Sequence, residues 1–312
     1  MINNKICCAM NSIEWFKALA DATRARILNL LLNRELNVKE MMDILGIGQS
    51  RISRHLKILT DCGLAQYKRD GLWSFYRAVN DGYAGRFLLS VHEYISEAGK
   101  NMDDLVKADI ILHERRESCK KFFDSVADDW SNIRRSIVGD KEIAEEFLEH
   151  LPSGVSADLG CGSGDLIISM FKWADSVIGV DFSREMLKKA AQKLEKYKDR
   201  LHLRIGQIEH LPLKEREVSS VVMNMVLHHL PNPSIAFEES FRVLENGGTA
   251  IVVDLCKHRI ESMRHLYGDQ WLGFFPASVI SWAEKAGFTL KEQGERAIKD
   301  TLTAFFVILR KP

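Results

Sequence analysis

A glycine-rich turn and an acidic residue after it have the types and spacing of a nucleoside-binding site. Asp158 and Leu159 end an apolar run, and the turn Gly160-Cys-Gly-Ser-Gly164 follows directly. Such a turn lets a ligand approach the backbone closely. Asp181 stands 17 residues after Gly164, and a carboxylate there can accept hydrogen bonds from both ribose hydroxyls. Because the turn lacks the Gly-x-Gly-x-x-Gly spacing of dinucleotide sites, an adenosine ligand without a pyrophosphate fits better than a nicotinamide dinucleotide.

Short apolar runs alternate with helical patterns around this turn. The alternation predicts an α/β, Rossmann-like fold with a parallel sheet covered by helices on both faces. The turn and Asp181 would then meet at the carboxyl edge of the sheet. The expected strands cover residues 155–159, 176–180, 202–205, 218–224 and 250–253, and the expected helices cover residues 165–171, 183–195 and a segment ending at Leu244.

The first 80 residues have a different pattern, in which short helices precede two extended segments. Asp21 is a suitable N-cap, and Asp70-Gly71 marks a hairpin turn. Helices, a tight turn and a β-hairpin in this order predict a mainly α winged helix-turn-helix. The expected helices cover residues 13–20, 22–32, 38–45 and 49–62, and the extended segments cover residues 64–68 and 73–79.

The net charge of the chain is zero, but the charges are unevenly distributed. Residues 1–89 carry 13 Lys and Arg against 8 Asp and Glu, whereas residues 90–312 carry 30 against 35. A basic front segment on a neutral chain is typical of a DNA-binding module fused to another domain. The start of the fourth helix would enter a major groove, and the hairpin would contact phosphates. The expected DNA-binding residues are Gln49, Ser50, Arg51, Ser53, Arg54, His55, Lys57, Lys68 and Arg69.

Three motifs of this region occur in one order: Phe16-Lys-Ala-Leu-Ala-Asp-Ala-Thr-Arg-Ala-Arg-Ile-Leu, Gln49-Ser-Arg-Ile-Ser-Arg-His-Leu-Lys-Ile-Leu, and Gly63-Leu. Residues 12–80 thereby resemble the ArsR family of bacterial transcriptional repressors. The resemblance implies a homodimer that binds a two-fold symmetric site on double-stranded DNA and releases it when an effector binds. Asn37 and Lys39 stand where metal-sensing members carry cysteines, so we expect no metal sensing in this domain.

Residues 81 to about 150 are rich in charged residues and helix formers. The apolar residues of segment 87–94 have helical spacing and suggest a helix that pairs with its dimer mate. A long connecting helix is expected around Met102–Val126, and its basic pair Arg115-Arg116 is expected to be solvated. The predicted multidomain organisation is a DNA-binding domain at 1–89, a helical dimerisation or connecting region at 90–150 and a nucleoside-binding domain at 151–312.

Five motifs follow one another in the second half: Asp158-Leu-Gly-Cys-Gly-Ser-Gly, Asp181-Phe-Ser-Arg-Glu-Met-Leu, Gly206-Gln-Ile-Glu-His-Leu-Pro-Leu, Leu227-His-His-Leu and Arg242-Val-Leu-Glu-Asn-Gly-Gly. Together they resemble the class I S-adenosylmethionine-dependent methyltransferases of the small-molecule type, over roughly residues 120–312. By this resemblance, Asp158, Gly160, Cys161, Gly162 and Gly164 face the methionine part of the ligand, Asp181 the ribose, and Phe182, Met186, Gln207 and Ile208 the adenine, while Asn224 and His229 close the pocket.

Two departures from the family pattern bear on catalysis. Gln207 stands where many members have Asp or Glu, although its carbonyl can still accept a hydrogen bond. Ser219 and Ser220 occupy the region where an Asp commonly opens the fourth strand. Both changes weaken the inference of catalysis more than that of binding, so no catalytic residue is assigned.

Two side-chain groups admit more than one interpretation. His228 and His229 are either loop residues or a metal pair; the first is favoured, and no metal cofactor is expected. Trp271, Phe274 and Phe275 are interpreted as core or pocket lid rather than as an aromatic cage.

Composition limits the class of protein. The chain has 312 residues, no apolar run long enough to span a membrane and no signal-peptide pattern, which favours a cytoplasmic protein. The six cysteines lack metal-site spacing and are interpreted as reduced thiols.

Two functions are consistent with the paired resemblances. In the first, S-adenosylhomocysteine or S-adenosylmethionine is an effector that controls DNA binding. This layout is similar to the SahR group of S-adenosylhomocysteine-responsive repressors, which implies control of methionine-cycle genes. In the second, the chain is a small-molecule methyltransferase with a fused autoregulatory DNA-binding domain. Methyl transfer needs little beyond positioning, so the absence of an evident general base does not decide between them.

Overall fold

The chain divides into two compact units, Met1–Glu114 and Arg115–Pro312. The computed structural model describes residues 12–98, 102–139, 143–299 and 302–312. The division falls inside helix α7 (Met102–Val126), whose bounds match the expected connecting helix. This helix contributes residues to both units, and the three segments expected from the sequence stay a prediction. Within the described residues, no helix combines the length and apolar character that a membrane span requires.

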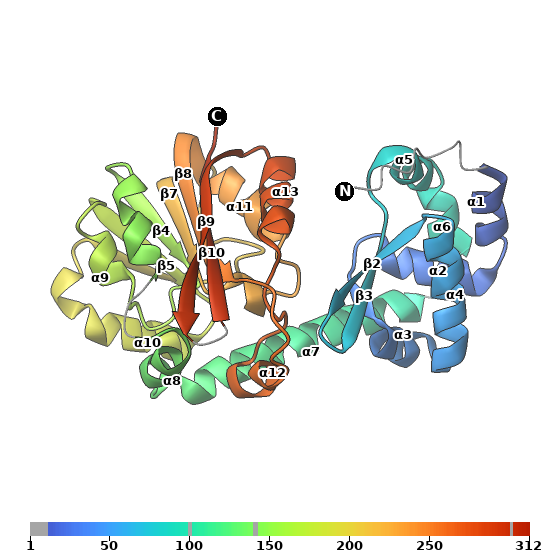
Figure 1. The fold of residues 1–312 in the computed structure, drawn as a ribbon, viewed down its shortest axis with the longest axis horizontal. Helices are drawn as coiled ribbons and strands as arrows, with labels where there is room; N and C mark the ends of the chain where they lie inside the picture. Colours follow the sequence, from blue (N-terminus) through green and yellow to red (C-terminus); the bar gives the residue numbers. More distant parts are fainter. Residues whose placement is uncertain (1–11, 99–101, 140–142, 300–301) are drawn as a thin grey trace. The chain divides into compact units, whose positions relative to one another are not determined.

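The first unit is a winged helix-turn-helix, as predicted (Figure 1). Its three-stranded antiparallel sheet has the order β1-β3-β2, with β2 and β3 as the predicted hairpin. The elements of this unit before α7 are α1 (Ser12–Leu19), α2 (Ala22–Leu31), β1 (Leu36–Asn37), α3 (Val38–Leu45), α4 (Gln49–Asp61), β2 (Ala65–Asp70), β3 (Trp73–Ala78), α5 (Gly82–Ser90) and α6 (His92–Ala98).

Local signals set the ends of these helices. Asp21 caps α2, where its Oδ1 accepts a hydrogen bond from the backbone N–H of Arg24 at 2.9 Å. Gly46 ends α3 in the left-handed region at φ 67°, which favours glycine, and the chain turns there into α4. The apolar face of α4 packs into the core of the unit, so its polar face is left for solvent or a ligand.

The second unit is a seven-stranded sheet between two layers of helices (Figure 1). The strand order is β6-β5-β4-β7-β8-β10-β9, and η1, α9 and α10 cover one face while α11 and α13 cover the other. The elements are α8 (Trp130–Val138), η1 (Ile143–His150), β4 (Val155–Leu159), α9 (Ile167–Met170), β5 (Ser176–Asp181), α10 (Arg184–Lys193), η2 (Glu195–Tyr197), β6 (Leu201–Ile205), β7 (Val218–Asn224), η3 (Leu227–His229), α11 (Ile235–Val243), β8 (Leu244–Leu255), α12 (Ser262–Tyr267), α13 (Pro276–Ala286), β9 (Thr289–Lys299) and β10 (Leu302–Arg310).

The sheet is mixed rather than wholly parallel, which corrects the expectation from the sequence. Strand β10 pairs antiparallel with both β8 and β9. Strands β9 and β10 are too close in sequence for the crossover helix that parallel pairing requires, so they form a hairpin. The five strands β4 to β8 are parallel, and their carboxyl ends share one edge.

Candidate functional site

An open cavity lies in the second unit, and its volume of about 1310 Å³ includes space that is open to solvent. It is bordered by the carboxyl ends of β4, β5 and β7, the edge at which α/β sheets bind ligands. The sequence predicted twelve residues for a nucleoside, and all but Gly164 line this cavity. Those that line it are Asp158, Gly160, Cys161, Gly162, Asp181, Phe182, Met186, Gln207, Ile208, Asn224 and His229.

The glycines of the turn serve two different purposes. Gly160 has φ 78°, and a Cβ there would lie 2.3 Å from Cγ2 of Val226, so a side chain would both strain the backbone and collide. Gly164 does not reach the cavity, because it faces α10. A Cβ on it would lie 2.7 Å from Cδ1 of Leu194. Gly164 thus permits close packing of the turn against α10.

Asp181 ends β5 and is held in one orientation by backbone donors. Its Oδ2 accepts a hydrogen bond from the N–H of Gly162 at 2.9 Å, and its Oδ1 accepts one from the N–H of Ser183 at 2.8 Å. Burial raises the pKa of Asp181 to about 6, against the lowering effect of these hydrogen bonds. Each carboxylate oxygen keeps acceptor capacity for a further donor.

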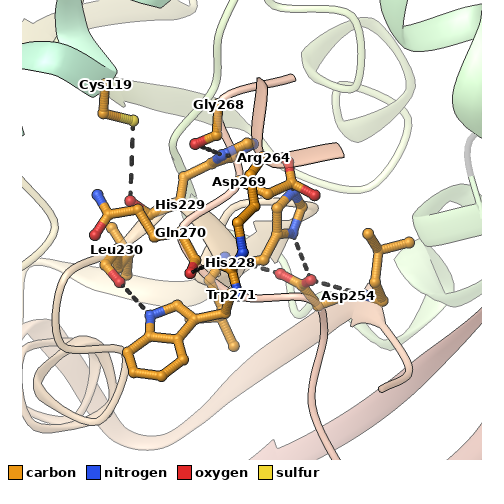
Figure 2. Close-up of polar contacts among 12 residues, drawn as sticks. Cys119, His228, His229, Leu230, Asp254, Arg264, Gly268, Asp269, Gln270 and Trp271 are labelled. Atoms are coloured by element: carbon orange, nitrogen blue, oxygen red, sulfur yellow. Dashed lines mark hydrogen bonds and ion pairs between the residues drawn. The ribbon is translucent and has the colours of Figure 1, made fainter. Parts of the chain in front are cut away.

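A buried group of two histidines and two aspartates forms another part of the second unit (Figure 2). His228 Nδ1 lies 2.6 Å from Oδ1 of Asp254, whose Oδ2 accepts a hydrogen bond from the N–H of Leu227 at 2.8 Å. His228 Nε2 lies 3.7 Å from Oδ1 of Asp269, and His229 Nδ1 lies 3.9 Å from the same oxygen. His228, His229 and Asp269 line the cavity.

The protonation states of this group follow from burial and charge. Burial alone would lower the pKa of His228, but the carboxylates of Asp254 and Asp269 outweigh it and raise that pKa to about 9. Burial, with the neighbouring His228, lowers the pKa of His229, which is therefore neutral at pH 7. Burial raises the pKa of Asp269 to about 6. Asp254 and Asp269 lie 26 and 41 residues after His228 in the chain, and no local motif connects them to it.

In the first unit, the start of α4 presents the predicted DNA-contacting side chains to solvent. Gln49, Ser50, Arg51, Ser53, Arg54 and Lys57 are all exposed. His55 differs from these residues because it is half-buried, and its Nδ1 lies 3.8 Å from Oδ1 of Asp21. The exposed face is thus polar and basic, and His55 is oriented toward α2 rather than outward.

The hairpin differs in detail from the expectation. Arg69 is exposed, but Lys68 is half-buried, and burial lowers its pKa to about 8. The turn lies at Gly71 and Leu72, between β2 and β3, so Gly71 is in the turn as expected, whereas Asp70 belongs to β2. Of the two predicted phosphate contacts, Arg69 is the more accessible.

Asn37, which stands where metal-sensing members of the ArsR family carry a cysteine, has a structural role at the start of α3. Its side chain accepts a hydrogen bond from the N–H of Glu40 at 3.0 Å, while Glu40 Oε2 accepts one from the N–H of Asn37 at 2.8 Å. This reciprocal capping box starts α3.

Comparison with known families identifies both units. Residues 21–67 match the family model of the bacterial regulatory proteins of the arsR family, and residues 157–252 match that of a methyltransferase domain. The chain joins an ArsR-family domain to a methyltransferase domain. The first match includes α2 to α4, and the second includes the glycine turn, Asp181 and η3.

Similar proteins match the methyltransferase domain. The ubiquinone/menaquinone biosynthesis C-methyltransferase UbiE of Geotalea daltonii is 23% identical over 53% of this chain and 74% of its own length. The demethylmenaquinone methyltransferase of Lactiplantibacillus plantarum is 38% identical over 34% of this chain, which spans about half (47%) of that protein. A solved chain from the complex containing the Haloferax volcanii Trm112 methyltransferase activator has a TM-score of 0.52 at 21% identity, over 61% of this chain and 97% of that one, and supports the fold.

One wall of the methyltransferase cavity comes from a region that the sequence assigned to a connecting role. Cys119 and Phe123 of α7 and Trp130 of α8 line the cavity, and the rings of Phe123 and Trp130 lie 5.0 Å apart. Arg116 was expected to be solvated; instead it is half-buried and lines the same wall. Phe123 and Trp130 lie on two different helices separated by a turn, so no helical spacing in the sequence marked this wall.

Glu209 also lines the cavity and was missed, although it lies two residues after the predicted Gln207. It is buried, which raises its pKa, whereas the nearby charge of Arg116 lowers it. Gln207 itself is exposed. A carboxylate is therefore present on this side of the cavity, although at a position other than the family pattern suggests.

The three aromatic residues with two interpretations divide between core and surface. Trp271 and Phe274 are buried, and Trp271 Nε1 donates a hydrogen bond to the carbonyl of Leu230 at 2.7 Å (Figure 2). Phe275 is exposed. The burial of Trp271 and Phe274 agrees with the interpretation that they belong to the core. The exposed Phe275 is in neither a core nor an aromatic cage.

Proposed function

We propose that this protein is a DNA-binding transcriptional regulator whose methyltransferase domain binds S-adenosylhomocysteine or S-adenosylmethionine as an effector. The observation that carries the proposal is the presence, in one chain, of an exposed basic face on α4 and a cavity built around the glycine turn and Asp181. The first feature suits a major groove, and the second suits an adenosine ligand.

A homodimer on a two-fold symmetric DNA site fits the surface of the ArsR-family domain. Large apolar side chains are exposed on α1, α5 and α6, namely Phe16, Tyr83, Leu89 and Tyr94. Exposed apolar side chains on adjoining elements mark an interaction surface, and a self-complementary patch produces a two-fold dimer. Two copies of α4 would then read two half-sites.

Helix α7 is the element through which the two activities are coupled in this proposal. In its first half, Asp104 accepts two hydrogen bonds from Arg26 of α2, at 2.7 and 2.8 Å. In its second half, Cys119 and Phe123 form part of the cavity wall. A ligand that moves Phe123 would therefore act on a helix anchored to the DNA-binding domain. Effector and DNA must then change each other's affinity by the same factor.

The experiment is a titration of S-adenosylhomocysteine into the protein bound to its two-fold DNA site, followed by fluorescence anisotropy. We expect the ligand to weaken DNA binding. In the Asp181→Ala variant, calorimetry should detect no nucleoside binding. Without nucleoside, this variant should bind DNA as tightly as the unsubstituted protein does. Unchanged DNA affinity at saturating ligand would exclude the effector role.

The narrower proposal is a repressor of methionine-cycle genes that responds to S-adenosylhomocysteine, as in the SahR group. It requires the demethylated nucleoside to bind more tightly than S-adenosylmethionine and to release DNA. Parallel calorimetric titrations of both nucleosides test this order, and tighter binding of S-adenosylmethionine would contradict it.

Small-molecule methyl transfer is the second candidate, and one observation favours it. The cavity extends beyond the residues expected to hold the nucleoside to His228 and Asp269, which leaves polar surface for a methyl acceptor. The similar proteins from Geotalea and Lactiplantibacillus are themselves described as methyltransferases. Incubation with radiolabelled S-adenosylmethionine and a cell extract, followed by chromatography, would reveal a labelled product that the Asp181→Ala variant does not form.

A further inference from the structure

The cavity of the methyltransferase domain contains three side chains of the types that bind metal ions, and one of them, His229, is also among the residues expected to close the nucleoside pocket. His228, His229 and Asp269 each offer one ligand atom, and these three atoms lie within 4.8 Å of one another. All three residues are buried. Two imidazoles in their neutral form and one carboxylate are a ligand set that suits transition metals.

The separations within this group are wrong for hydrogen bonds and suitable for a shared ion. Oδ1 of Asp269 lies 3.7 Å from His228 Nε2 and 3.9 Å from His229 Nδ1, and hydrogen bonds to oxygen rarely exceed about 3.2 Å. Ligands about 2.1 Å from a tetrahedral ion lie roughly 3.4 Å apart. Small side-chain shifts would therefore place an ion between the three atoms.

The carboxylate of Asp269 carries the inference furthest. The residue is only 4% exposed, and neither carboxylate oxygen has a hydrogen-bond partner. A buried carboxylate without hydrogen bonds is costly unless a cation compensates it. With no ion bound, the proton held by His228 supplies that charge, and a metal ion at the site would displace this proton. The nearby Arg264 donates hydrogen bonds to the carbonyl of Gln270 and, at 3.2 Å, to Oε2 of Glu261, while its charge lowers the pKa of Asp269 without cancelling the effect of burial. The carboxylate is thus directed at the histidines with its acceptor capacity unused.

His228 is oriented as metal-binding histidines usually are. Its Nδ1 contacts Asp254 at 2.6 Å, so its Nε2 faces the other side, toward Asp269 (Figure 2). Asp254 is itself fixed by the N–H groups of Leu227 and Leu255. A carboxylate that holds the second nitrogen of a histidine fixes the tautomer and ring orientation that a metal needs.

We propose that His228, His229 and Asp269 bind one divalent transition-metal ion, for which zinc is the best match to the ligand set, and that Asp254 positions His228. Magnesium and calcium fit poorly because they prefer oxygen ligands. Three protein ligands leave a tetrahedral ion one position for water or a ligand in the cavity. The ion needs neither DNA nor nucleoside, so this inference stands apart from the proposed function.

The test is calorimetric titration of zinc chloride into the full-length protein after removal of metal by chelator. We expect one zinc ion to bind at this site. Replacing a residue that only positions a metal ligand costs about 10- to 100-fold in metal affinity, so Asp254→Asn should weaken zinc binding by that factor. Asp269→Asn replaces a ligand itself and should weaken zinc binding roughly 100-fold or more. The matched control is His202→Ala, which removes an exposed histidine of β6 and should bind zinc as the unsubstituted protein does.

A second readout uses cobalt as a spectroscopic substitute for zinc. The unsubstituted protein should show the visible bands of a four-coordinate cobalt ion without a sulfur charge-transfer band. The His229→Gln variant should lose these bands, and it serves as a second test if Asp269→Asn does not fold. Circular dichroism checks the fold of each variant. The proposal is overturned if the protein binds no zinc, or if folded His229→Gln and Asp269→Asn bind zinc as tightly as His202→Ala does.

Discussion

The buried pair of His228 and Asp254 should make the stability of the methyltransferase domain depend on pH. The pKa of His228 is raised to about 9, from an ordinary value near 6.5. Each tenfold gain in proton affinity on folding corresponds to about 1.4 kcal/mol, so this histidine contributes about 3 kcal/mol to the free energy of unfolding. Its side chain is 6% exposed, so solvent screens this contribution little.

The sign of the dependence follows from the direction in which the pKa moves. Because the folded state holds the proton more tightly, the contribution is fully present below about pH 6.5 and is lost as the pH rises through about 9. Asp254→Asn removes the carboxylate that raises the pKa and should abolish this dependence. The difference in unfolding free energy between the unsubstituted protein and Asp254→Asn should therefore shrink by about 3 kcal/mol between pH 6 and pH 10.

The assay is urea unfolding at a series of pH values, in chelator, followed by tryptophan fluorescence. Trp271 is a suitable reporter because it is buried and bonded to Leu230 beside the pair. The pKa of Lys68, in the other unit, is lowered to about 8, so its contribution to the unfolding free energy increases as the pH rises. Comparing each variant with the unsubstituted protein at the same pH removes this contribution. His228→Gln should flatten the same part of the curve. A pH dependence equal to that of the unsubstituted protein in both variants would refute the reasoning.

Three further predictions concern the ligand, the DNA and the dimer. Gly160→Ala should abolish nucleoside binding in calorimetry, since its Cβ has no space, whereas Gly139→Ala, with a similarly positive φ but open surroundings, should bind as before. Arg51→Ala and Arg54→Ala should each weaken operator binding by about 1 to 3 kcal/mol in a mobility-shift assay while nucleoside affinity is unchanged; full operator affinity would exclude their base contacts. Leu89→Glu, at a residue 75% exposed, should convert the dimer to a monomer in sedimentation, and an unchanged mass would place the interface elsewhere.

The sequence alone predicted those parts of the protein that depend on local signals. Strand β7 and helix α7 have the bounds that periodicity indicated, and the capping residue Asp21 has its expected role. The glycine turn and Asp181 were identified because each motif is continuous in sequence and lies at a strand end. Both domain families followed from such motifs and were confirmed by the family models.

The tertiary structure decided which distant residues meet. Asp254 lies near the end of β8, and Asp269 follows α12, so their approach to His228 depends on the order of strands and on loop paths that no short motif encodes. The same holds for the cavity wall from α7, because a helical pattern shows that a face is apolar but not what it covers. Local hydrogen bonding and sterics fix turns and helix ends, whereas side chains far apart in sequence become neighbours only through packing of the whole sheet.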